Sequence, residues 1–297
     1  MKQKIILALL LFIGGVNASE RTTHTVWTIH ESNYILSYTV TPPDVAGGNW
    51  TWEYEKAIDT TECPKPRAAC PGNNVVYVVD DSGKIVKYST DGVYDSTVAT
   101  GLPQPQSICL SPDGQYLYLC SMKSGYEGVY RYPLNNISSG GLYIGSDAVY
   151  QPRQIFFGED GLLYVCSRNT QPNSGVKSFD CSGDKPKLST FYDPTYGNKK
   201  YSNDGSCCLD IANKRLVMQR ATVNNATVAL VFDYVSPENV TGGTVNPYDS
   251  KTSTLGTSFG SICLDGDCFA ADYSNKAVVQ MAADGSFSGT PFVTEKT

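Results

Sequence analysis

The chain has 297 residues, 41% of them hydrophobic, and a formal net charge of −6 at pH 7. This length allows one large domain or two small ones with a sizeable core. The acidic balance and the lack of a lysine and arginine cluster argue against a nucleic-acid partner, because a phosphate backbone requires a basic face.

The N-terminal segment has the pattern of a secretory signal peptide. Two lysines give a positive start, an apolar run covers 5–16, and Ala18 is a small residue suited to cleavage. A membrane-spanning helix needs about 20 apolar residues, so an N-terminal membrane anchor is the less favoured alternative. We therefore expect a signal peptide at 1–18 and a single secreted, extracellular domain at 19–297, without a transmembrane segment.

A repeated unit follows this segment. Its clearest copy has a strand at 106–110, a Pro-Asp-Gly turn at 112–114 and a second strand at 116–120 that alternates aromatic and aliphatic residues. A third strand follows at 128–132. Weaker outer strands lie between the copies, at 50–54, 96–99 and 291–294.

Copies of this unit predict the fold. They are spaced roughly 40 to 50 residues apart, which is the length of a propeller blade. No sustained helical period occurs after the signal segment, so a helical architecture is excluded. We predict an all-β, six-bladed β-propeller with disulfides, because a β-sandwich with an appended domain does not explain six copies in one register. The second-strand positions used to measure the spacing are Trp27, Tyr77, Tyr118, Tyr164, Val217 and Phe269.

The first copy lacks an obvious inner strand. It has second and third strands at 26–30 and 34–38, but only 19–25 precede them. A missing strand would leave backbone groups unpaired, so we expect the mature N-terminus or the tail at 290–297 to fill the position. A strand from another molecule is the alternative.

All ten cysteines lie beyond residue 18, and an even number behind a secretion signal predicts disulfides that link blades rather than carry redox chemistry. Cys263 and Cys268 flank a short hairpin and should be bonded. Zinc is disfavoured because no paired CxxC spacing occurs. Two further pairs are possible: Cys109 with Cys120, and Cys63 with Cys70. Four cysteines have no partner that the sequence indicates: Cys166, Cys181, Cys207 and Cys208.

Four Asn-x-Ser/Thr sequons lie beyond the signal segment and predict N-glycosylation in a eukaryotic source. Together with the disulfides, they indicate an extracellular glycoprotein. The four asparagines are Asn49, Asn136, Asn225 and Asn239.

The clearest copy also carries a family resemblance. The phrase from Pro105 to Gly114, followed by 117–120, resembles six-bladed propellers of the NHL-repeat and sugar-lactone lactonase (gluconolactonase) type. In those proteins P-x-x-I-x-x-x-P-D-G-x-L-Y-V is a frequent blade phrase. The resemblance covers most of the mature chain as a blade pattern and implies the fold, but a propeller scaffold hosts many activities.

The same resemblance offers a test for an enzyme. Lactonases of this type hold a divalent metal with a Glu, two Asn and an Asp from inner strands. Asn203 and Asp204 look like the phrase that supplies one asparagine, but no Gly-Glu-Gly-Pro phrase opens the first blade. The corresponding positions elsewhere are Gln106, Arg153 and Gly260. A hard cation needs several convergent oxygens, so we interpret Asn203 and Asp204 as a turn and strand cap.

Other catalytic patterns are absent from the sequence. There is no Gly-x-Ser-x-Gly phrase, and His24 and His30, the only histidines, share one predicted strand. The aromatic stretch at 50–54 is better read as an outer strand than as a carbohydrate-stacking stripe.

We therefore expect a cofactor-free scaffold that contacts other extracellular proteins or copies of itself. The alternatives are a divergent metal-dependent hydrolase of the lactonase type and a carbohydrate-binding module. The central channel discriminates between the first two. Convergent carboxylates would favour the hydrolase, and a wall of Cys, Gly and aliphatic residues would favour the scaffold.

Overall fold

The computed structural model describes residues 9–12, 23–30, 34–44, 49–99, 104–167, 175–192, 195–196, 199–200, 202–203, 207–210, 215–223, 226–233, 258–272 and 277–281. Regular structure among these residues is all β, apart from one 3-10 turn at Ile137–Ser139. The described residues form no helix that is both long and apolar enough to cross a membrane.

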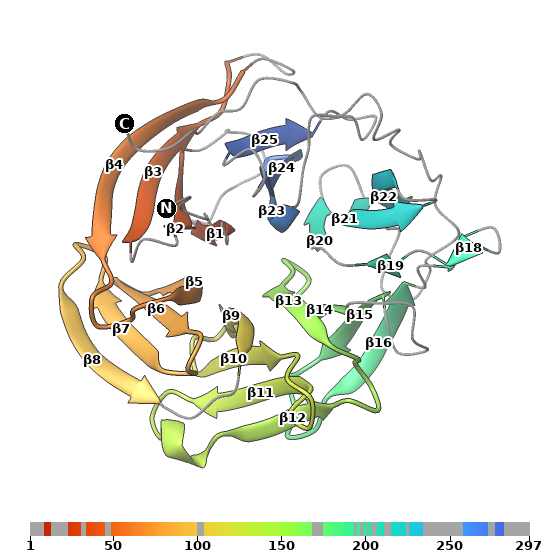
Figure 1. Cartoon of the computed structure of the whole chain (residues 1–297), viewed down its shortest axis with the longest axis horizontal. Coiled ribbons are helices and arrows are strands. Elements are labelled where there is room, and N and C mark those ends of the chain that lie inside the picture. Colours follow the sequence, from red (N-terminus) through yellow and green to blue (C-terminus); the bar gives the residue numbers. More distant parts are fainter. Residues whose placement is uncertain are drawn as a thin grey trace.

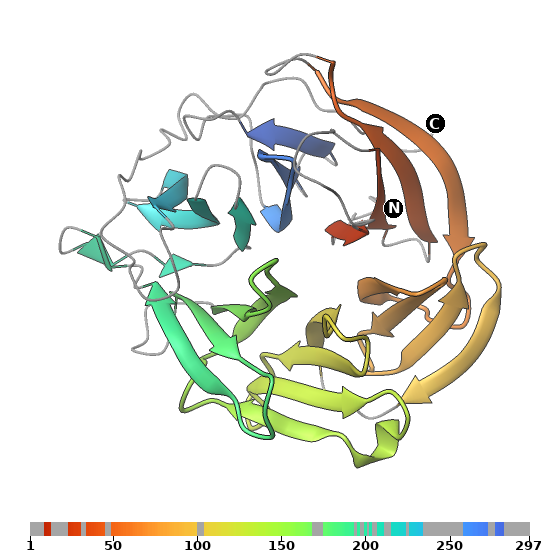
Figure 2. The ribbon, with the colours of Figure 1, turned by 180° about the vertical axis from the view of Figure 1, so that it is seen from behind.

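The strands form antiparallel sheets that stand around a central axis, each with one edge strand facing that axis (Figures 1 and 2). The first sheet contains β1 (Leu9–Phe12), β2 (His24–His30), β3 (Tyr34–Thr41) and β4 (Thr51–Asp59). The second contains β5 (Pro66–Gly72), β6 (Val75–Asp80), β7 (Ile85–Ser89) and β8 (Tyr94–Ala99). The third contains β9 (Pro105–Leu110), β10 (Tyr116–Ser121), β11 (Gly128–Pro133) and β12 (Gly141–Gly145).

The second half of the ring continues the pattern. The fourth sheet contains β13 (Pro152–Phe157), β14 (Leu163–Ser167), β15 (Gly175–Asp180) and β16 (Lys187–Tyr192). A small hairpin, β17 (Thr195–Tyr196) and β18 (Lys199–Lys200), precedes β19 (Ser202–Asn203), β20 (Cys207–Asp210), β21 (Arg215–Val223) and β22 (Ala226–Asp233), which form the fifth sheet. The last sheet has three described strands: β23 (Ser258–Leu264), β24 (Asp267–Asp272) and β25 (Ala277–Met281). The predicted all-β propeller is therefore confirmed.

The Pro-Asp-Gly turn explains why the β9–β10 hairpin forms. The Asp113 carboxylate accepts hydrogen bonds from the Ser111 hydroxyl at 2.5 Å and from the Gln115 backbone N–H at 3.0 Å. Gly114 has a φ of +69°, which glycine adopts at little cost. The turn places Cys109 directly opposite Tyr118, as the repeat predicts.

The core lies between neighbouring sheets. The middle strands β6, β10 and β14 are buried along almost their whole length, because each sheet in the ring is covered on both faces. Tyr118 on β10 packs edge-on against Phe157 on β13, with ring centroids 5.2 Å apart. Apolar packing of this kind joins one sheet to the next.

The ring closes by packing the first sheet against the last. Trp50 packs edge-on against Phe269 at 5.3 Å, and its indole N–H donates to the Asp267 carboxylate at 2.9 Å. His24 Nε2 lies 3.1 Å from the Asp265 carboxylate. These contacts bring together residues from opposite ends of the chain.

The inner strand of the first sheet comes from a segment that the sequence assigns to the signal peptide. In β1, Leu9 lies opposite Thr28 and Phe12 opposite Thr25 on β2. Residues 19–22 and the tail at 290–297, which were expected in this position, lie outside the described residues. The inner strand is thus supplied within the chain, but by a different segment from either candidate.

Candidate functional site

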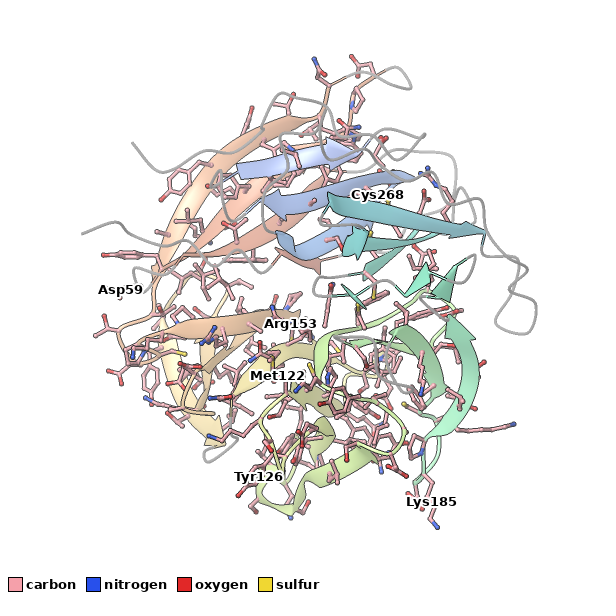
Figure 3. The ribbon with its side chains drawn as sticks, turned by 45° about the vertical axis from the view of Figure 1, so that its right-hand side comes forward. Asp59, Met122, Tyr126, Arg153, Lys185 and Cys268 are labelled. Carbon is pink, nitrogen blue, oxygen red and sulfur yellow. A yellow bond between two sulfur atoms is a disulfide. The ribbon has the colours of Figure 1, made fainter. Side chains whose placement is uncertain are left out.

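The inner strands surround a cavity at the centre of the ring. Its volume is about 300 Å³, and its walls come from β5, β9, β13, β20 and β23. In Figure 3, Arg153 on β13 lies toward the middle of the ring, whereas Lys185 lies at its rim. The cavity is therefore the central channel in which the sequence places a possible active site.

Apolar and cysteine residues make up most of the channel wall. Glu159 is the one carboxylate among the described residues that line it, and Arg153 is the one cation. Carboxylates do not converge here. The apolar lining residues include Ala68, Ala69, Ile108, Ile155, Phe156 and Ile262, and the cysteines are Cys70, Cys109, Cys208 and Cys263.

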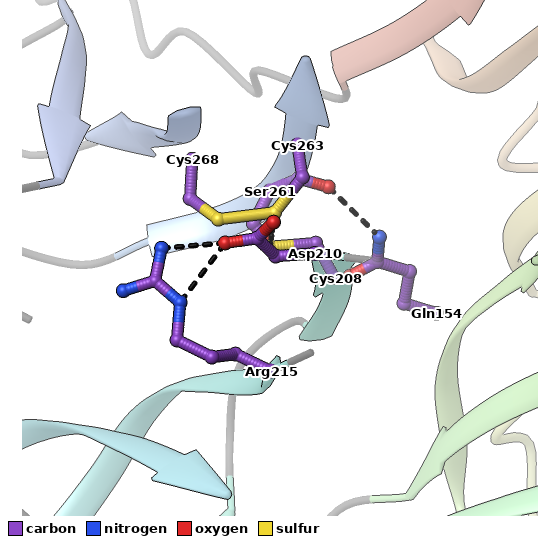
Figure 4. The surroundings of a disulfide bond; sticks show 7 residues. All are labelled: Gln154, Cys208, Asp210, Arg215, Ser261, Cys263 and Cys268. Carbon is purple, nitrogen blue, oxygen red and sulfur yellow. Dashed lines mark hydrogen bonds and ion pairs between the residues drawn. A yellow bond between two sulfur atoms is a disulfide. The ribbon is translucent and has the colours of Figure 1, made fainter. Parts of the chain in front are cut away.

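Polar side chains in the wall bind neighbouring strands. The Gln154 amide N–H donates to the Ser261 carbonyl at 3.3 Å (Figure 4). The Gln154 side-chain carbonyl oxygen accepts from the Cys207 backbone N–H at 2.9 Å. One side chain thus connects the fourth, fifth and last sheets. Similarly, the Ser107 hydroxyl on β9 donates to the Ile155 carbonyl on β13 at 3.3 Å. These groups hold the ring together.

The four wall cysteines share one position of the repeat. In three sheets this cysteine lies opposite the second-strand residue that was used to measure the repeat spacing. In the last sheet Cys263 lies opposite Cys268, whereas the sequence had placed Phe269 at that position. Burial raises the pKa of Cys208 to about 12. It also raises the pKa of Cys70 and of Cys109. The thiols are therefore neutral near pH 7, which makes them poor nucleophiles.

The predicted disulfide between Cys263 and Cys268 is present. The other eight cysteines are thiols in the structure, so the two further pairs that the sequence allowed are not formed. Cys120 lies two positions beyond the residue opposite Cys109, and such diagonal neighbours are about 7–8 Å apart, too far for a disulfide.

The pair Cys63 and Cys70 is separated by the extended strand β5. Cys63 sits in the turn before this strand, and its backbone N–H donates to the Thr60 carbonyl at 2.7 Å. Cys70 lies four residues after the start of β5, about 13 Å along an extended chain. The disulfide between Cys63 and Cys70, which the sequence suggested as closing a small loop, is therefore not formed.

Two thiols without a predicted partner meet another cysteine across a sheet boundary. The Cys208 Sγ lies 3.3 Å from the Cys263 Sγ. Cys207 on β20 interacts with Cys166 on β14, and the pKa of Cys207 is raised by burial and by this neighbour. The shared repeat position of Cys208 and Cys263 was the signal for the first contact, although the sequence does not show which sheets adjoin, and no sequence signal indicated the second.

No protein-family model and no curated protein matches the chain. Solved structures do match it. A structure described as a nidogen/laminin complex is 16% identical with a TM-score of 0.61, covering 90% of this chain and 92% of that chain. The periplasmic gluconolactonase of Pseudomonas aeruginosa is 14% identical with a TM-score of 0.59, covering 95% and 83%.

Hydrazine synthase of Kuenenia stuttgartiensis is 13% identical with a TM-score of 0.60, covering 96% of this chain and 78% of that chain. Sequence identities this low, over such a large share of both chains, establish only the fold of this chain. The chain is a β-propeller.

The described residues of the channel do not supply the ligands of the metal site that the lactonase resemblance implies. Asn203, which the sequence interpretation assigned to a turn and strand cap, lies on the short strand β19 opposite Ala221, before the inner strand β20. Asp204 lies outside the described residues. The corresponding positions on other sheets, Gln106, Arg153 and Gly260, line the channel without offering a carboxylate. A hard divalent cation requires more oxygen ligands than these residues provide.

Three of the remaining candidate residues, His24, Asn49 and Asn136, are not among the residues that line the channel. His24 is buried against Asp265, so it is a structural histidine. Asn49 and Asn136 are exposed, and the Asn136 side-chain oxygen accepts a hydrogen bond from the Ser138 hydroxyl at 2.8 Å. Asn225 and Asn239 are outside the part of the chain whose side chains the structure describes.

Proposed function

We propose that this chain is a secreted, N-glycosylated, six-bladed propeller that serves as a scaffold for contact with other extracellular proteins. The observation that carries the proposal is the channel wall. Gln154 and Ser107 form hydrogen bonds between the sheets, and the described residues of the wall include a single carboxylate. These residues of the wall stabilise the ring, and those that the structure describes do not offer a convergent set of metal ligands.

Six blades follow if the three-stranded sheet β23–β25 is counted with the five four-stranded sheets. The outer strand expected at 291–294 would complete it. Support comes from the packing of Phe269 on this sheet against Trp50 on the first, which closes the ring without room for a further sheet between them.

Secretion and glycosylation rest on independent features of the sequence. The signal pattern, the even number of cysteines and the exposed positions of Asn49 and Asn136 all agree with passage through a secretory pathway. Cleavage after Ala18 would remove β1, so in the secreted form another strand would take the inner position of the first sheet. One structure of similar fold is described as periplasmic.

The outer rim of the first two sheets offers a surface for a partner. Tyr54 on β4 is 47% exposed, and Tyr94 at the start of β8 is 46% exposed. The two sheets are joined at the rim by Lys56 and Asp91, whose charged atoms lie 3.6 Å apart. Tyrosine is enriched in protein interfaces because it buries a large ring and keeps a polar hydroxyl.

A double variant tests this surface. We expect Tyr54→Ser with Tyr94→Ser to reduce partner recovery at least about tenfold in cross-linking from the native medium, since two anchors at about 1 kcal/mol or more each are lost. The matched control is Leu188→Ser, which removes an apolar side chain that is 51% exposed on β16. Equal recovery by all three proteins, at equal melting temperature, would contradict the assignment of this surface.

The enzyme alternative has a separate test. Because the described residues of the channel wall offer no convergent carboxylates, we expect Asp204→Ala to leave lactone hydrolysis at the background rate of the wild type, with or without added Ca²⁺ or Zn²⁺. Metal content should be measured on the same samples. Stoichiometric metal in the wild type that is lost from the variant would instead support the hydrolase.

A further inference from the structure

Three cysteine sulfurs meet where the fifth and last sheets adjoin the channel. Cys208 comes from β20, Cys263 from β23 and Cys268 from β24 (Figure 4). Cys263 and Cys268 are bonded, and the Cys208 Sγ lies 3.3 Å from the Cys263 Sγ. All three sulfurs lie within 4.8 Å of one another.

The repeat explains this convergence. Cys208 and Cys263 hold the same position on neighbouring inner strands, and Cys268 lies directly across the hairpin from Cys263. Cys208 and Cys268 are buried and form a small apolar cluster with Val217, and the half-buried Cys263 packs against this cluster. Cys263 therefore has two cysteine neighbours, one within its own sheet and one in the next sheet.

We propose that these residues form a disulfide-exchange site in which Cys263 bonds either to Cys268 or to Cys208. The Cys208 thiol loses its proton, and the thiolate attacks the Cys263 sulfur. The bond between Cys263 and Cys268 breaks, and Cys268 leaves as a thiolate that takes up a proton. One disulfide and one thiol are present before and after the step, so no oxidant or reductant is consumed.

The exchange moves a covalent link from one sheet to the boundary between two. The bond between Cys263 and Cys268 spans a sequence separation of 5, whereas Cys208 and Cys263 are 55 residues apart. A bond that closes a longer loop restricts the unfolded chain more strongly. The exchanged form thus locks the fifth and last sheets together beside the channel.

Charges around Cys208 set the rate of this exchange. Burial raises the pKa of Cys208 to about 12, and the neighbouring Ser261 hydroxyl lowers it. Among the charged and titratable neighbours, Asp210 and Cys166 raise the pKa and Arg215 lowers it. Only the thiolate attacks, so the rate should rise about tenfold for each pH unit below the pKa.

The test follows the wild-type full chain after a shift from pH 6 to pH 8 or 9, without added thiol or oxidant. Samples are quenched in acid, alkylated under denaturing conditions and mapped without reduction. We expect alkylation of Cys268 to rise as that of Cys208 falls, about tenfold faster at pH 9 than at pH 8 and independently of protein concentration. Alkylation of Cys208 alone at every time and pH would overturn the proposal.

Two variants identify the attacking thiol. In Cys208→Ser, the bond between Cys263 and Cys268 should be the sole linkage, and Cys268 should stay unalkylated throughout. The matched control is Cys181→Ser, because Cys181 lies against Tyr143 and Tyr118 and away from the three sulfurs. Its exchange should match the wild type. Alkylation of Cys268 in Cys208→Ser would also contradict the proposal. If a variant does not fold, the wild-type time course still tests the proposal.

Discussion

Trp50→Ala should destabilise the protein by about 3–5 kcal/mol, the usual cost of truncating a buried tryptophan. Trp50 is 3% exposed and packs against Phe269, so its removal leaves a cavity where the first and last sheets meet. The Asp267 carboxylate also loses the indole donor at 2.9 Å. In a domain of this size, the melting temperature should fall by roughly 6–20 °C.

Two further variants separate the causes of this loss. Trp50→Phe keeps an aromatic ring against Phe269 but removes the donor to Asp267, so it should cost only about 1 kcal/mol. Tyr126→Ala truncates an aromatic side chain that is 52% exposed and should stay within about 0.5 kcal/mol of wild type. The sequon at Asn49 tolerates alanine in its middle position, so glycosylation does not confound the comparison. An unchanged melting temperature for Trp50→Ala would mean that the ring closes elsewhere.

The strand pairing within a sheet could be predicted from the sequence, because the repeated hairpin pattern indicates which residues face each other. The β9–β10 hairpin follows from the turn at 112–114 and the alternation after it, and the structure confirms the pairing of Cys109 with Tyr118. The disulfide between Cys263 and Cys268 was predictable for the same reason. The one-residue error at Phe269 arose because the last hairpin turns on Asp265 and Gly266 alone, which is shorter than the Pro-Asp-Gly hairpin.

Contacts between sheets could not be predicted, because they depend on how the ring closes. His24 and Asp265 are 241 residues apart, and nothing in either local pattern indicates the other. For the same reason, the sequence did not predict the approach of Cys208 to Cys263 or the hydrogen bonds by which Gln154 connects three sheets. A short apolar run is compatible with either a signal segment or a strand, and for this reason the sequence did not predict β1.

A buried ion pair lies beside Cys208, Cys263 and Cys268, and breaking it should have the second large effect on the stability of the protein. Asp210 on β20 is 1% exposed and lies directly opposite Arg215 on β21. Arg215 Nε donates to the Asp210 carboxylate at 2.9 Å (Figure 4). Arg215→Met should cost about 3–5 kcal/mol, because it leaves a buried carboxylate without its cation. The free energy of unfolding, from denaturant titration at neutral pH, measures the loss.

The double variant Arg215→Met with Asp210→Leu decides whether that cost comes from the unpaired charge. Replacing both partners by apolar residues of similar volume removes the buried charge, so the double variant should be more stable than Arg215→Met alone. The coupling free energy should exceed about 1 kcal/mol, as for residues in direct contact. Additive losses would show instead that Arg215 acts through packing of its aliphatic stem. Because Arg215 also lowers the pKa of Cys208, Arg215→Met should slow disulfide exchange at a given pH while leaving Cys208 as the attacking thiol.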